Sequence, residues 1–307
     1  MTATGNEAVK LAQLRTATGS TGSGGATGSE AVTIAQAAES LGITPTGTPD
    51  VGGRAIRLSQ LKTAVEAFPS VEIVPWSTGT DEQIAAMVAA ADAGKIVLSD
   101  YWSAGDTRTV QLSAMAADNV NESHAAQSVE FVLTDPGHYT LANGQPCNFV
   151  VLQKDCLEKR GYMNSQGTNS GGWNNCKRRT WCNGTYRNSI PATLRPIFKQ
   201  FKNYAANGTG SAALESTDYF SLFSEKEVFG SCSYSNATAE ANNTQLDYYK
   251  TSYNRIKKGG INGNSYYWWE RSPNSVETNA FCRVDTGGSA SSSMANGSRG
   301  VAPFGCI

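Results

Sequence analysis

Residues 280–285 combine an aromatic ring, a cation and an anion at alternating positions. If this run, AFCRVD, forms a strand, its period of two points Phe281, Arg283 and Asp285 to one face. The intervening Ala, Cys and Val then face the core. A face of this kind can bind a ligand by stacking, charge and hydrogen bonds, without a covalent step. The alternative is that a loop covers Phe281 while Arg283 and Asp285 form a solvated pair.

A segment of small polar residues follows this strand. Between Thr286 and Gly300 the sequence contains only Gly, Ala, Ser, Thr and Asn, apart from Met294 and Arg299. This composition is too poor in apolar side chains to bury a core of its own. Its two adjacent glycines predict a tight turn. The further candidate ligand-binding residues in and before this segment are Ser275, Glu277, Thr278, Asn279, Ser289, Ser291, Ser292, Ser293, Met294, Asn296, Ser298 and Arg299.

Two apolar segments flank the polar one. YWWERSP precedes it at residues 267–273, and GVAPFGCI follows it at residues 300–307. We expect both to be a rigid scaffold that displays the segment between them. The residues assigned to the scaffold are Trp268, Trp269, Arg271, Pro303 and Phe304. Because neighbours on a strand face opposite ways, the alternative is that one of the two tryptophans lines the ligand pocket.

Several further motifs occur in a fixed order upstream. They are GWNNC at 172–176 with Arg179 and Trp181, IPATLRPIFK at 190–199, SEKEVFG at 224–230, and Tyr248-Tyr249 before NRIKK at 254–258. Together with the C-terminal segments, this series resembles the C-type-lectin-fold proteins that diversity-generating retroelements mutate in bacteriophages and bacteria. That group is related to the formylglycine-generating-enzyme fold, and the series is similar to its phage and gut-bacterial branch. The resemblance runs from about Trp76 to Ile307.

The resemblance implies an α+β domain with a C-type lectin fold over residues 71–307. The ligand-binding part at about 265–300 would be varied by adenine-directed mutagenesis, while the flanking scaffold holds the fold. Recognition in that family is non-catalytic. The implied protein is therefore a phage receptor-binding, tropism-determining protein.

Catalytic residues are not predicted. The related sulfatase-modifying enzymes use a reactive cysteine pair, and no cysteine pair here lies in a segment that resembles that site. His124 and His138 are the only histidines, so any Ser-His-Asp or Cys-His arrangement must use one of them. Both lie in polar or turn-like contexts, and we expect both at the surface.

Metal and disulfide chemistry are likewise not expected. Calcium requires clustered carboxylate and amide oxygens, and the nearest candidates, Glu270, Asn274 and Glu277, form no recognisable loop motif. We therefore predict no metal and no cofactor, although a structural ion remains an open alternative. Seven cysteines, an odd number without CxxC spacing, predict free and mostly buried thiols rather than a disulfide framework.

Charge and hydropathy exclude two classes of partner. The 25 basic and 26 acidic residues leave a net charge of −1, without the basic surplus of a nucleic-acid binder. No stretch approaches the roughly 20 apolar residues of a membrane span. Residues 1–13 lack the basic start and apolar core of a signal peptide. We expect a protein made in a bacterial cytoplasm and carried on a virion, with no membrane insertion.

The first 70 residues contain an internal repeat. Similar heptapeptides occur at 8–14, 31–37 and 55–61, and their glutamines are 23 and 24 residues apart. Gly/Ser/Thr-rich connectors separate the copies. Since so small a unit cannot bury its apolar stripe alone, residues 1–70 are predicted to attach the protein to a virion tail, tail fibre or other structural protein, or to sister subunits. The alternative is a flexible leader.

Residues beyond 70 show the signals of a compact domain. A capping box at Thr80 predicts a helix that Gly94 stops. We predict a second helix capped by Ser189 and running past Tyr204 to Asn207, and a third from near Asn243 to Ile256. Strands are expected at 96–102, 107–112, 129–133 and 149–153. Few helices and many short strands describe an α+β domain.

Taken together, these features predict a non-catalytic phage protein that binds a host-cell surface protein or glycan. Weak contacts of this kind gain from avidity, so we expect a homo-oligomer, for example a trimer. The alternative is a structural or decoration protein of the virion without a specific receptor. A cell-borne adhesin is a third class, which the missing signal peptide disfavours.

Overall fold

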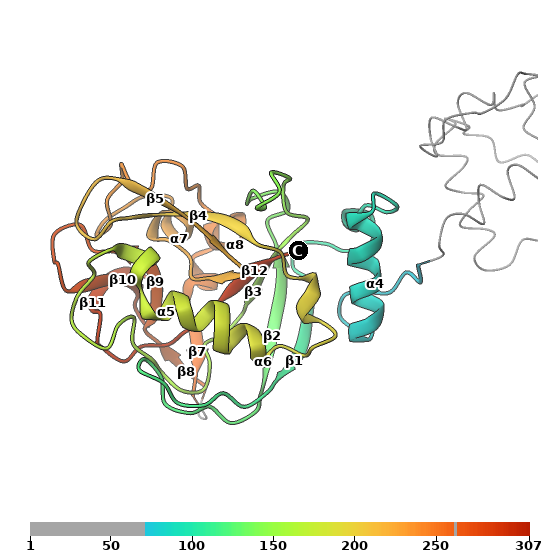
Figure 1. Cartoon of the computed structure of the whole chain (residues 1–307), viewed down its shortest axis with the longest axis horizontal. Helices are drawn as coiled ribbons and strands as arrows, with labels where there is room; N and C mark the ends of the chain where they lie inside the picture. Colours follow the sequence, from blue (N-terminus) through green and yellow to red (C-terminus); the bar gives the residue numbers. More distant parts are fainter. Residues whose placement is uncertain (1–70, 261–262) are drawn as a thin grey trace, which may run out of the picture. The chain divides into compact units, whose positions relative to one another are not determined.

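The computed structural model describes residues 71–260 and 263–307. They form a mixed helical and β-sheet domain, in agreement with the predicted α+β class (Figure 1). The N-terminal repeat lies outside the described residues. In the part of the chain that is described, no helix has both the length and the apolar character that crossing a membrane requires.

The central element is a five-stranded antiparallel sheet in the order β1-β2-β3-β12-β6. Its strands are β1 (Thr107–Leu112), β2 (Gln127–Thr134), β3 (Val150–Gln153), β12 (Phe304–Cys306) and β6 (Phe220–Ser221). The last strand of the chain therefore lies inside the sheet, with a partner on each side. All residues from 301 to 307 are buried, as expected for a scaffold segment.

A second sheet contains the predicted binding segment. It has the order β11-β10-β9, with β9 (Trp268–Pro273), β10 (Ala280–Val284) and β11 (Ala290–Met294). Every residue of β9 is buried, whereas the residues of β11, at the edge, are half-buried or exposed. The sheet is therefore buried in the core at β9 and exposed to solvent at β11.

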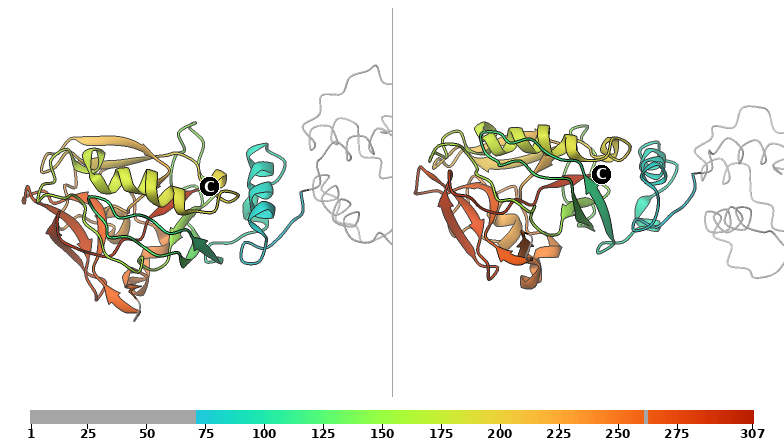
Figure 2. Two further views of the ribbon diagram at one scale, coloured as in Figure 1. Left: turned by 60° about the horizontal axis from the view of Figure 1, so that its bottom comes forward. Right: turned by 90° about the horizontal axis from the view of Figure 1, so that it is seen from below.

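Two hairpins complete the β structure: β4 (Phe201–Ala206) with β5 (Ala213–Asp218), and β7 (Lys257–Gly259) with β8 (Asn264–Tyr266). The α-helices are α4 (Asp81–Asp92), α5 (Lys177–Trp181), α6 (Arg187–Ser189), α7 (Glu225–Phe229) and α8 (Asp247–Lys250). A π-helical turn, Cys182–Tyr186, joins α5 to α6. Both turned views place α4 at one end of the domain and the β9–β11 sheet at the other (Figure 2).

Two buried clusters pack against these sheets. One contains Trp173, Trp269 and Phe281, and the other contains Trp268, Val284 and Phe304. Because adjacent residues of β9 belong to different clusters, the β9–β10 part of the small sheet is buried on both faces. The phenyl rings of Phe223 and Phe304 stack with centroids 4.0 Å apart, which ties the C-terminal strand to the second cluster.

Several predicted elements are confirmed. The helix at Asp81–Asp92 begins with the predicted capping box, in which Thr80 and Gln83 exchange backbone-to-side-chain hydrogen bonds. Strands occur as predicted at 107–112, and within a residue or two of the bounds predicted for β2 and β3. All five scaffold residues are buried, including both tryptophans, so neither tryptophan lines an exposed pocket.

The second predicted helix is wrong. After α6 the chain forms only a short 3₁₀ turn, Arg195–Ile197, and then enters β4. Pro196 removes a backbone donor and disfavours helical geometry at the residue before it. From Phe201 onward, alternate residues are buried and the strand pairs with β5, so sheet pairing overrides an apolar spacing that also suits a helix.

Two other elements also differ from expectation. The third predicted helix is reduced to α8 and a 3₁₀ turn at Ser252–Arg255, because Thr251 between them adopts an extended backbone conformation. The strand predicted at 96–102 is a 3₁₀ turn, Leu98–Asp100. The buried Trp102 follows this turn, and its indole N–H donates to the Val74 carbonyl at 2.9 Å.

Candidate functional site

Tyr267, the residue before β9, lies close to two arginines at the surface. The Arg283 guanidinium carbon is 4.1 Å from the centre of its ring, and that of Arg299 is 5.8 Å away. Both distances are within cation–π range. The Tyr267 side chain is 38% exposed, and the arginines are half-buried. We call these three residues the Tyr267 surface.

Backbone pairing brings the three residues together from separate segments. Arg283 lies opposite Trp269 in the β10–β9 ladder, next to Tyr267 on the same face. Arg299 precedes Gly300, whose N–H donates to the Tyr267 carbonyl at 2.7 Å. The Trp269 N–H in turn donates to the Gly300 carbonyl at 3.0 Å, so the return segment is fixed along β9. The surface is therefore positioned by backbone hydrogen bonds as well as by side chains.

The guanidinium groups are oriented by the polar segment itself. Arg283 Nε donates to the Ser292 carbonyl at 2.9 Å. Arg299 Nε donates to Ser293 Oγ at 3.1 Å, and its Nη1 donates to the Ser298 carbonyl at 2.7 Å. These bonds leave terminal N–H groups of both side chains without a protein acceptor among the described residues. Such groups are the donors that a polar ligand can use.

β11 supplies hydroxyl groups beside the arginines. Ser291 pairs with Arg283 and Ser293 with Phe281, so both serines share the face of the Tyr267 surface. Ser292 faces the other way and donates to Glu277 Oε2 at 3.3 Å. The exposed part of this sheet is thus made of hydroxyls and guanidiniums, with Met294 as an exposed apolar side chain at its end.

Phe281 does not belong to this surface, contrary to the prediction. Its ring is fully buried in the same cluster as Trp173 and Trp269. The period of two does place Phe281 and Arg283 on one face. However, the pairing with β9 is irregular between them, because four residues of β9 span two of β10. On that face, Phe281 is buried by other core residues, whereas Arg283 is partly exposed to solvent.

Asp285 has a role in the turn rather than on the strand face. Its Oδ1 accepts hydrogen bonds from the N–H groups of Gly287 at 2.9 Å and Ser289 at 2.8 Å. Gly288 adopts a φ of 85°, which favours glycine. The turn predicted from the two glycines is therefore present, and Asp285 stabilises it while remaining partly exposed.

Five of the remaining candidates form a rim at the other end of the strands. Ser275 and Asn279 are half-buried, while Glu277, Thr278 and Asn296 are exposed. A Cβ at Gly167 would lie 3.6–3.8 Å from atoms of Asn296, Met294 and Asn279, which shows that these three side chains gather at one point. Ser289 is exposed near the turn, and Ser298 is half-buried beside Arg299.

Asn169, which belongs to no motif that the sequence predicts to be functional, holds this rim in place. Its buried Nδ2 donates to the carbonyls of Asn274, Glu277 and Ala280 at 2.9–3.1 Å. A backbone bond from Asn169 to Thr278 at 2.8 Å adds to these contacts. Tyr267 was not predicted as a surface residue, because it belongs to the apolar YWWERSP segment expected to form the scaffold. Its position next to a strand that is buried throughout gave no signal of exposure.

Comparison with known proteins places the surface within a described family. The model of the family "Domain of unknown function (DUF6273)" matches residues 148–307, which is more than half of the chain. The chain belongs to this family. No curated protein and no solved structure matches it. The DUF6273 region contains β3 to β12 and therefore the whole Tyr267 surface, whereas α4, β1 and β2 precede it.

The buried strands β9 and β10 of the small sheet pack against a group of buried carboxylates. Glu227 forms a two-point ion pair with Arg271. Glu225 accepts backbone N–H groups of Tyr234 and Ser235. Glu240 accepts from Ser272 Oγ and from a backbone N–H. Each of these carboxylates therefore has protein donors.

Glu270 differs from the other three. Both of its carboxylate oxygens are buried without a hydrogen-bond partner. Burial, followed by the neighbouring carboxylates, raises the pKa of Glu270 well above its ordinary value. Across residues 71–260 and 263–307, no group of three or more His, Cys, Asp or Glu side chains is arranged to hold a metal ion. Of the other two calcium candidates, Asn274 is buried and its Nδ2 donates to Oε2 of the exposed Glu277 at 3.3 Å.

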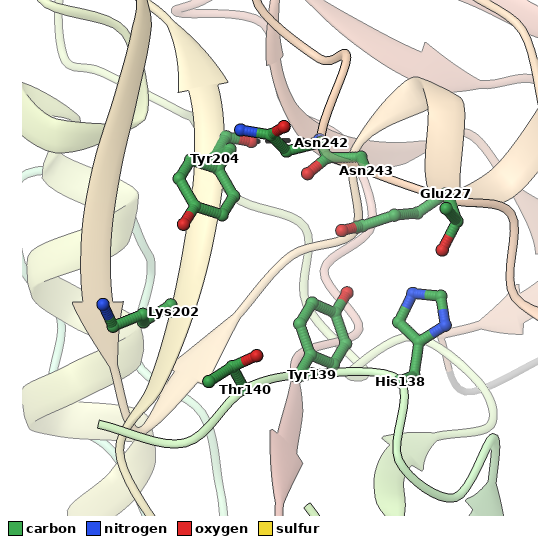
Figure 3. A pocket seen from close by; sticks show the side chains of 9 residues that line it. His138, Tyr139, Thr140, Lys202, Tyr204, Glu227, Asn242 and Asn243 are labelled. Carbon is green, nitrogen blue, oxygen red and sulfur yellow. Dashed lines mark hydrogen bonds between the residues drawn. The ribbon is translucent and has the colours of Figure 1, made fainter. Parts of the chain in front are cut away.

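A pocket lies where the DUF6273 region meets the loop before β3 (Figure 3). Its lining residues are His138, Tyr139, Thr140, Lys202, Tyr204, Glu227, Asn242, Asn243 and Thr244. Glu227 is occupied by Arg271, and burial raises the pKa of Tyr139 well above its ordinary value. The pocket therefore presents neither a free carboxylate base from Glu227 nor an activated tyrosine.

The two histidines lie in different environments. His138 is half-buried at the pocket, with its ring centroid 4.8 Å from that of Tyr139. His124 is buried, so its predicted surface position is wrong. It packs beside Trp181, and burial lowers its pKa to about 4. His124 is therefore neutral at physiological pH. Its side chain packs against an aromatic ring and is buried from solvent.

All seven cysteines are free, and six are buried, as predicted. Burial raises the pKa of Cys156 to about 12 and that of Cys176 to about 11. A thiol in this state has little thiolate at neutral pH, and the thiolate is the reactive form. Within the DUF6273 region these cysteines act as small apolar core residues.

Proposed function

We propose that this protein is a bacteriophage receptor-binding protein that determines host tropism without catalysis. It would bind a host-cell surface protein or glycan through the Tyr267 surface and the rim beside it. The observation that carries this proposal is the contrast within one sheet. β9 is buried throughout, while β11, built from small polar residues, is half-buried or exposed. Side chains at such an edge can change with little effect on stability.

We also propose that the domain has the C-type lectin fold and is a variable protein of a diversity-generating retroelement. The α+β architecture and the buried C-terminal strand are consistent with that fold. The polar segment is fixed at both ends, by β10 on one side and by the Gly300–Tyr267 hydrogen bond on the other. A segment held in this way can vary in sequence while keeping its position.

Attachment to the virion would use residues 1–70. The described chain begins near α4, and α4 lies at the opposite end of the domain from β11 (Figure 2). An attachment through that end would leave the binding surface directed away. A trimer or other homo-oligomer would multiply weak contacts, since avidity can raise affinity by roughly 10² to 10⁴.

The test is binding of the labelled full-length protein to a panel of gut-bacterial isolates, measured by flow cytometry. The variant to compare carries alanine at Arg283, Ser291, Ser293, Met294 and Arg299. None of these side chains is fully buried, so the fold should be retained. The proposal requires that the wild type binds some isolates and that this variant does not.

A matched control removes the same number of positive charges elsewhere. Lys95→Ala with Lys250→Ala alters two exposed lysines outside the small sheet. This control should bind as the wild type does. Equal binding by the five-residue variant, or binding of no isolate by the wild type, would favour a structural or decoration protein of the virion instead.

A further inference from the structure

Three arginines gather around two consecutive tyrosines at the Tyr267 surface. Arg283 and Arg299 contact Tyr267, and the Arg160 guanidinium carbon lies 4.2 Å from the centre of the Tyr266 ring. Arg160 is brought close because its neighbour Gly161 exchanges backbone hydrogen bonds with Arg299 at 2.8 and 3.0 Å. Four separate segments of the chain therefore converge on one cationic patch.

These arginines lack the carboxylate partner that three other arginines of the domain have. Arg108, Arg179 and Arg271 each form an ion pair with a carboxylate, at Asp81, Asp218 and Glu227 respectively. Among the described residues, Arg160, Arg283 and Arg299 form no ion pair. The charge of Asp285, which follows β10, opposes the lowering of the pKa of Arg283 by burial, while the Asp285 Oδ1 accepts hydrogen bonds from the turn.

The positive charges also act on one another. Burial, followed by the charges of Arg283 and Arg160, lowers the pKa of Arg299. Burial likewise lowers the pKa of Arg283, although Tyr267 and Asp285 oppose the effect. Both guanidiniums stay charged at neutral pH because their ordinary pKa is so high. An anion placed between them would relieve this repulsion and accept their free N–H groups.

The chemistry around the arginines favours a sugar as the carrier of that anion. Ser291 and Ser293 present hydroxyl groups, and Tyr267 presents an exposed aromatic ring. With Phe281 buried, the large exposed side chains at this surface are Tyr267, which packs against the arginines, and Met294 at the end of β11. The other side chains beside the arginines carry hydroxyl groups. Hydroxyl and guanidinium donors suit a polar, hydroxyl-rich ligand.

We propose that Arg283 and Arg299, with Arg160 beside them, bind the anionic group of an acidic glycan. The group is a carboxylate, sulfate or phosphate, all of which a guanidinium recognises through paired N–H donors. This inference rests on the proposed receptor-binding role and specifies its ligand. Arg283 and Arg299 provide the charge, and the serine hydroxyls contact the sugar.

The test measures binding of the full-length protein to immobilised polysaccharides by biolayer interferometry. Polygalacturonate, dextran sulfate and a glycerol-phosphate teichoic acid supply the three anions, and unmodified dextran is the neutral control. Polyglutamate tests an acidic peptide. We expect binding to at least one acidic polysaccharide and weaker binding to dextran and polyglutamate. Affinity should fall by about tenfold or more in Arg283→Ala/Arg299→Ala, the loss typical of charge-assisted contacts.

Two variants separate specific recognition from general attraction. Lys95→Ala/Lys250→Ala removes the same charge and should keep wild-type affinity. Arg283→Lys/Arg299→Lys keeps the charge but loses the paired donors, so its affinity should lie between wild type and the alanine variant. Equal affinity of the alanine variant and the wild type, binding to none of the acidic polysaccharides, or equal binding to polyglutamate would overturn the proposal.

The same variants distinguish this inference from the proposed function. If Arg283→Ala/Arg299→Ala binds bacterial cells normally while the five-residue variant does not, the receptor role stands and the acidic-glycan site does not. If the arginines bind an acidic polysaccharide but the wild type binds no cells, the site stands and the receptor role does not.

Discussion

Arg271 and Glu227 form a two-point ion pair inside the domain, with both N–O distances at 2.6 Å and both side chains fully buried. The pair joins β9 to α7, because Glu227 also accepts the N–H of Ser224 in the capping box of that helix. It therefore fixes the buried strand of the small sheet against the rest of the core.

Replacing Arg271 should be strongly destabilising. Arg271→Met leaves Glu227 buried without its cation, which we expect to cost about 3–5 kcal/mol in the free energy of unfolding. Arg179→Met is the matched control, because its partner Asp218 keeps hydrogen bonds from Trp173, Asn203 and Ser216. Urea denaturation of both variants measures the difference. Equal losses in the two variants would contradict the assigned role.

The same pair predicts sensitivity to acid. Although burial opposes it, the charge of Arg271 holds the pKa of Glu227 below its ordinary value of 4.5. The stability that this group contributes is therefore complete above about pH 4.5 and is lost as the pH falls through the lower, folded pKa. Arg271→Met/Glu227→Gln should lose less stability than the wild type between pH 5 and pH 3. Parallel curves of stability against pH would argue against this coupling.

Glu270 predicts the opposite dependence. Because its folded pKa is raised above 4.5, its contribution to stability is complete below that pH and declines as the pH rises toward the folded pKa. Glu270→Gln should remove this decline, which for one group is at most about 1.4 kcal/mol per pH unit. Denaturation at pH 5 and pH 8 compares the variant with wild type. An unchanged dependence in Glu270→Gln would contradict the prediction.

Phe281 and Met294 should respond to alanine in different ways. Phe281→Ala opens a cavity in the core and is expected to cost about 3–5 kcal/mol. Met294 is 53% exposed, so Met294→Ala should change stability by no more than about 0.5 kcal/mol. Thermal unfolding followed by circular dichroism distinguishes them. A small effect of Phe281→Ala would restore Phe281 as a candidate surface residue.

Asn169 should control the order of the rim. Asn169→Asp keeps the shape but replaces the donor with an acceptor that faces three carbonyl groups. We expect a loss of about 1–3 kcal/mol and faster amide exchange in residues 274–280. Hydrogen exchange with mass spectrometry measures the second effect. Asn164→Asp serves as control, since Asn164 contacts Thr168 and Lys177 instead.

The sequence was sufficient to predict the parts of the fold that depend on local signals. The capping box at Thr80 and the alternation in 107–112 are such signals, and both elements are present. The stretch around Phe201 failed because its apolar spacing suits a helix as well as a strand. Only its pairing with β5, a contact between segments, decides between them.

For the candidate site, too, local signals in the sequence predicted some features, while contacts between distant segments determined the others. The polar composition of residues 286–300 predicted an exposed segment, and the half-buried or exposed residues of β11 agree with it. The period of two correctly placed Phe281 and Arg283 on one face. It could not reveal that the core covers one of them, or that Tyr267 and Arg160 join Arg283. Those relations depend on the irregular β9–β10 pairing and on the Gly161–Arg299 bridge.

The position of β12 has a consequence for biosynthesis. About 150 residues separate β12 from its partner β3, and the polar segment is translated just before it. A chain that is interrupted or shifted out of frame within residues 286–300 lacks the strand that joins β3 to β6. Both strands then keep unpaired edges, which promote aggregation and degradation. Loss of β12 would therefore disrupt the pairing of two neighbouring strands, and not only remove the last strand of the chain.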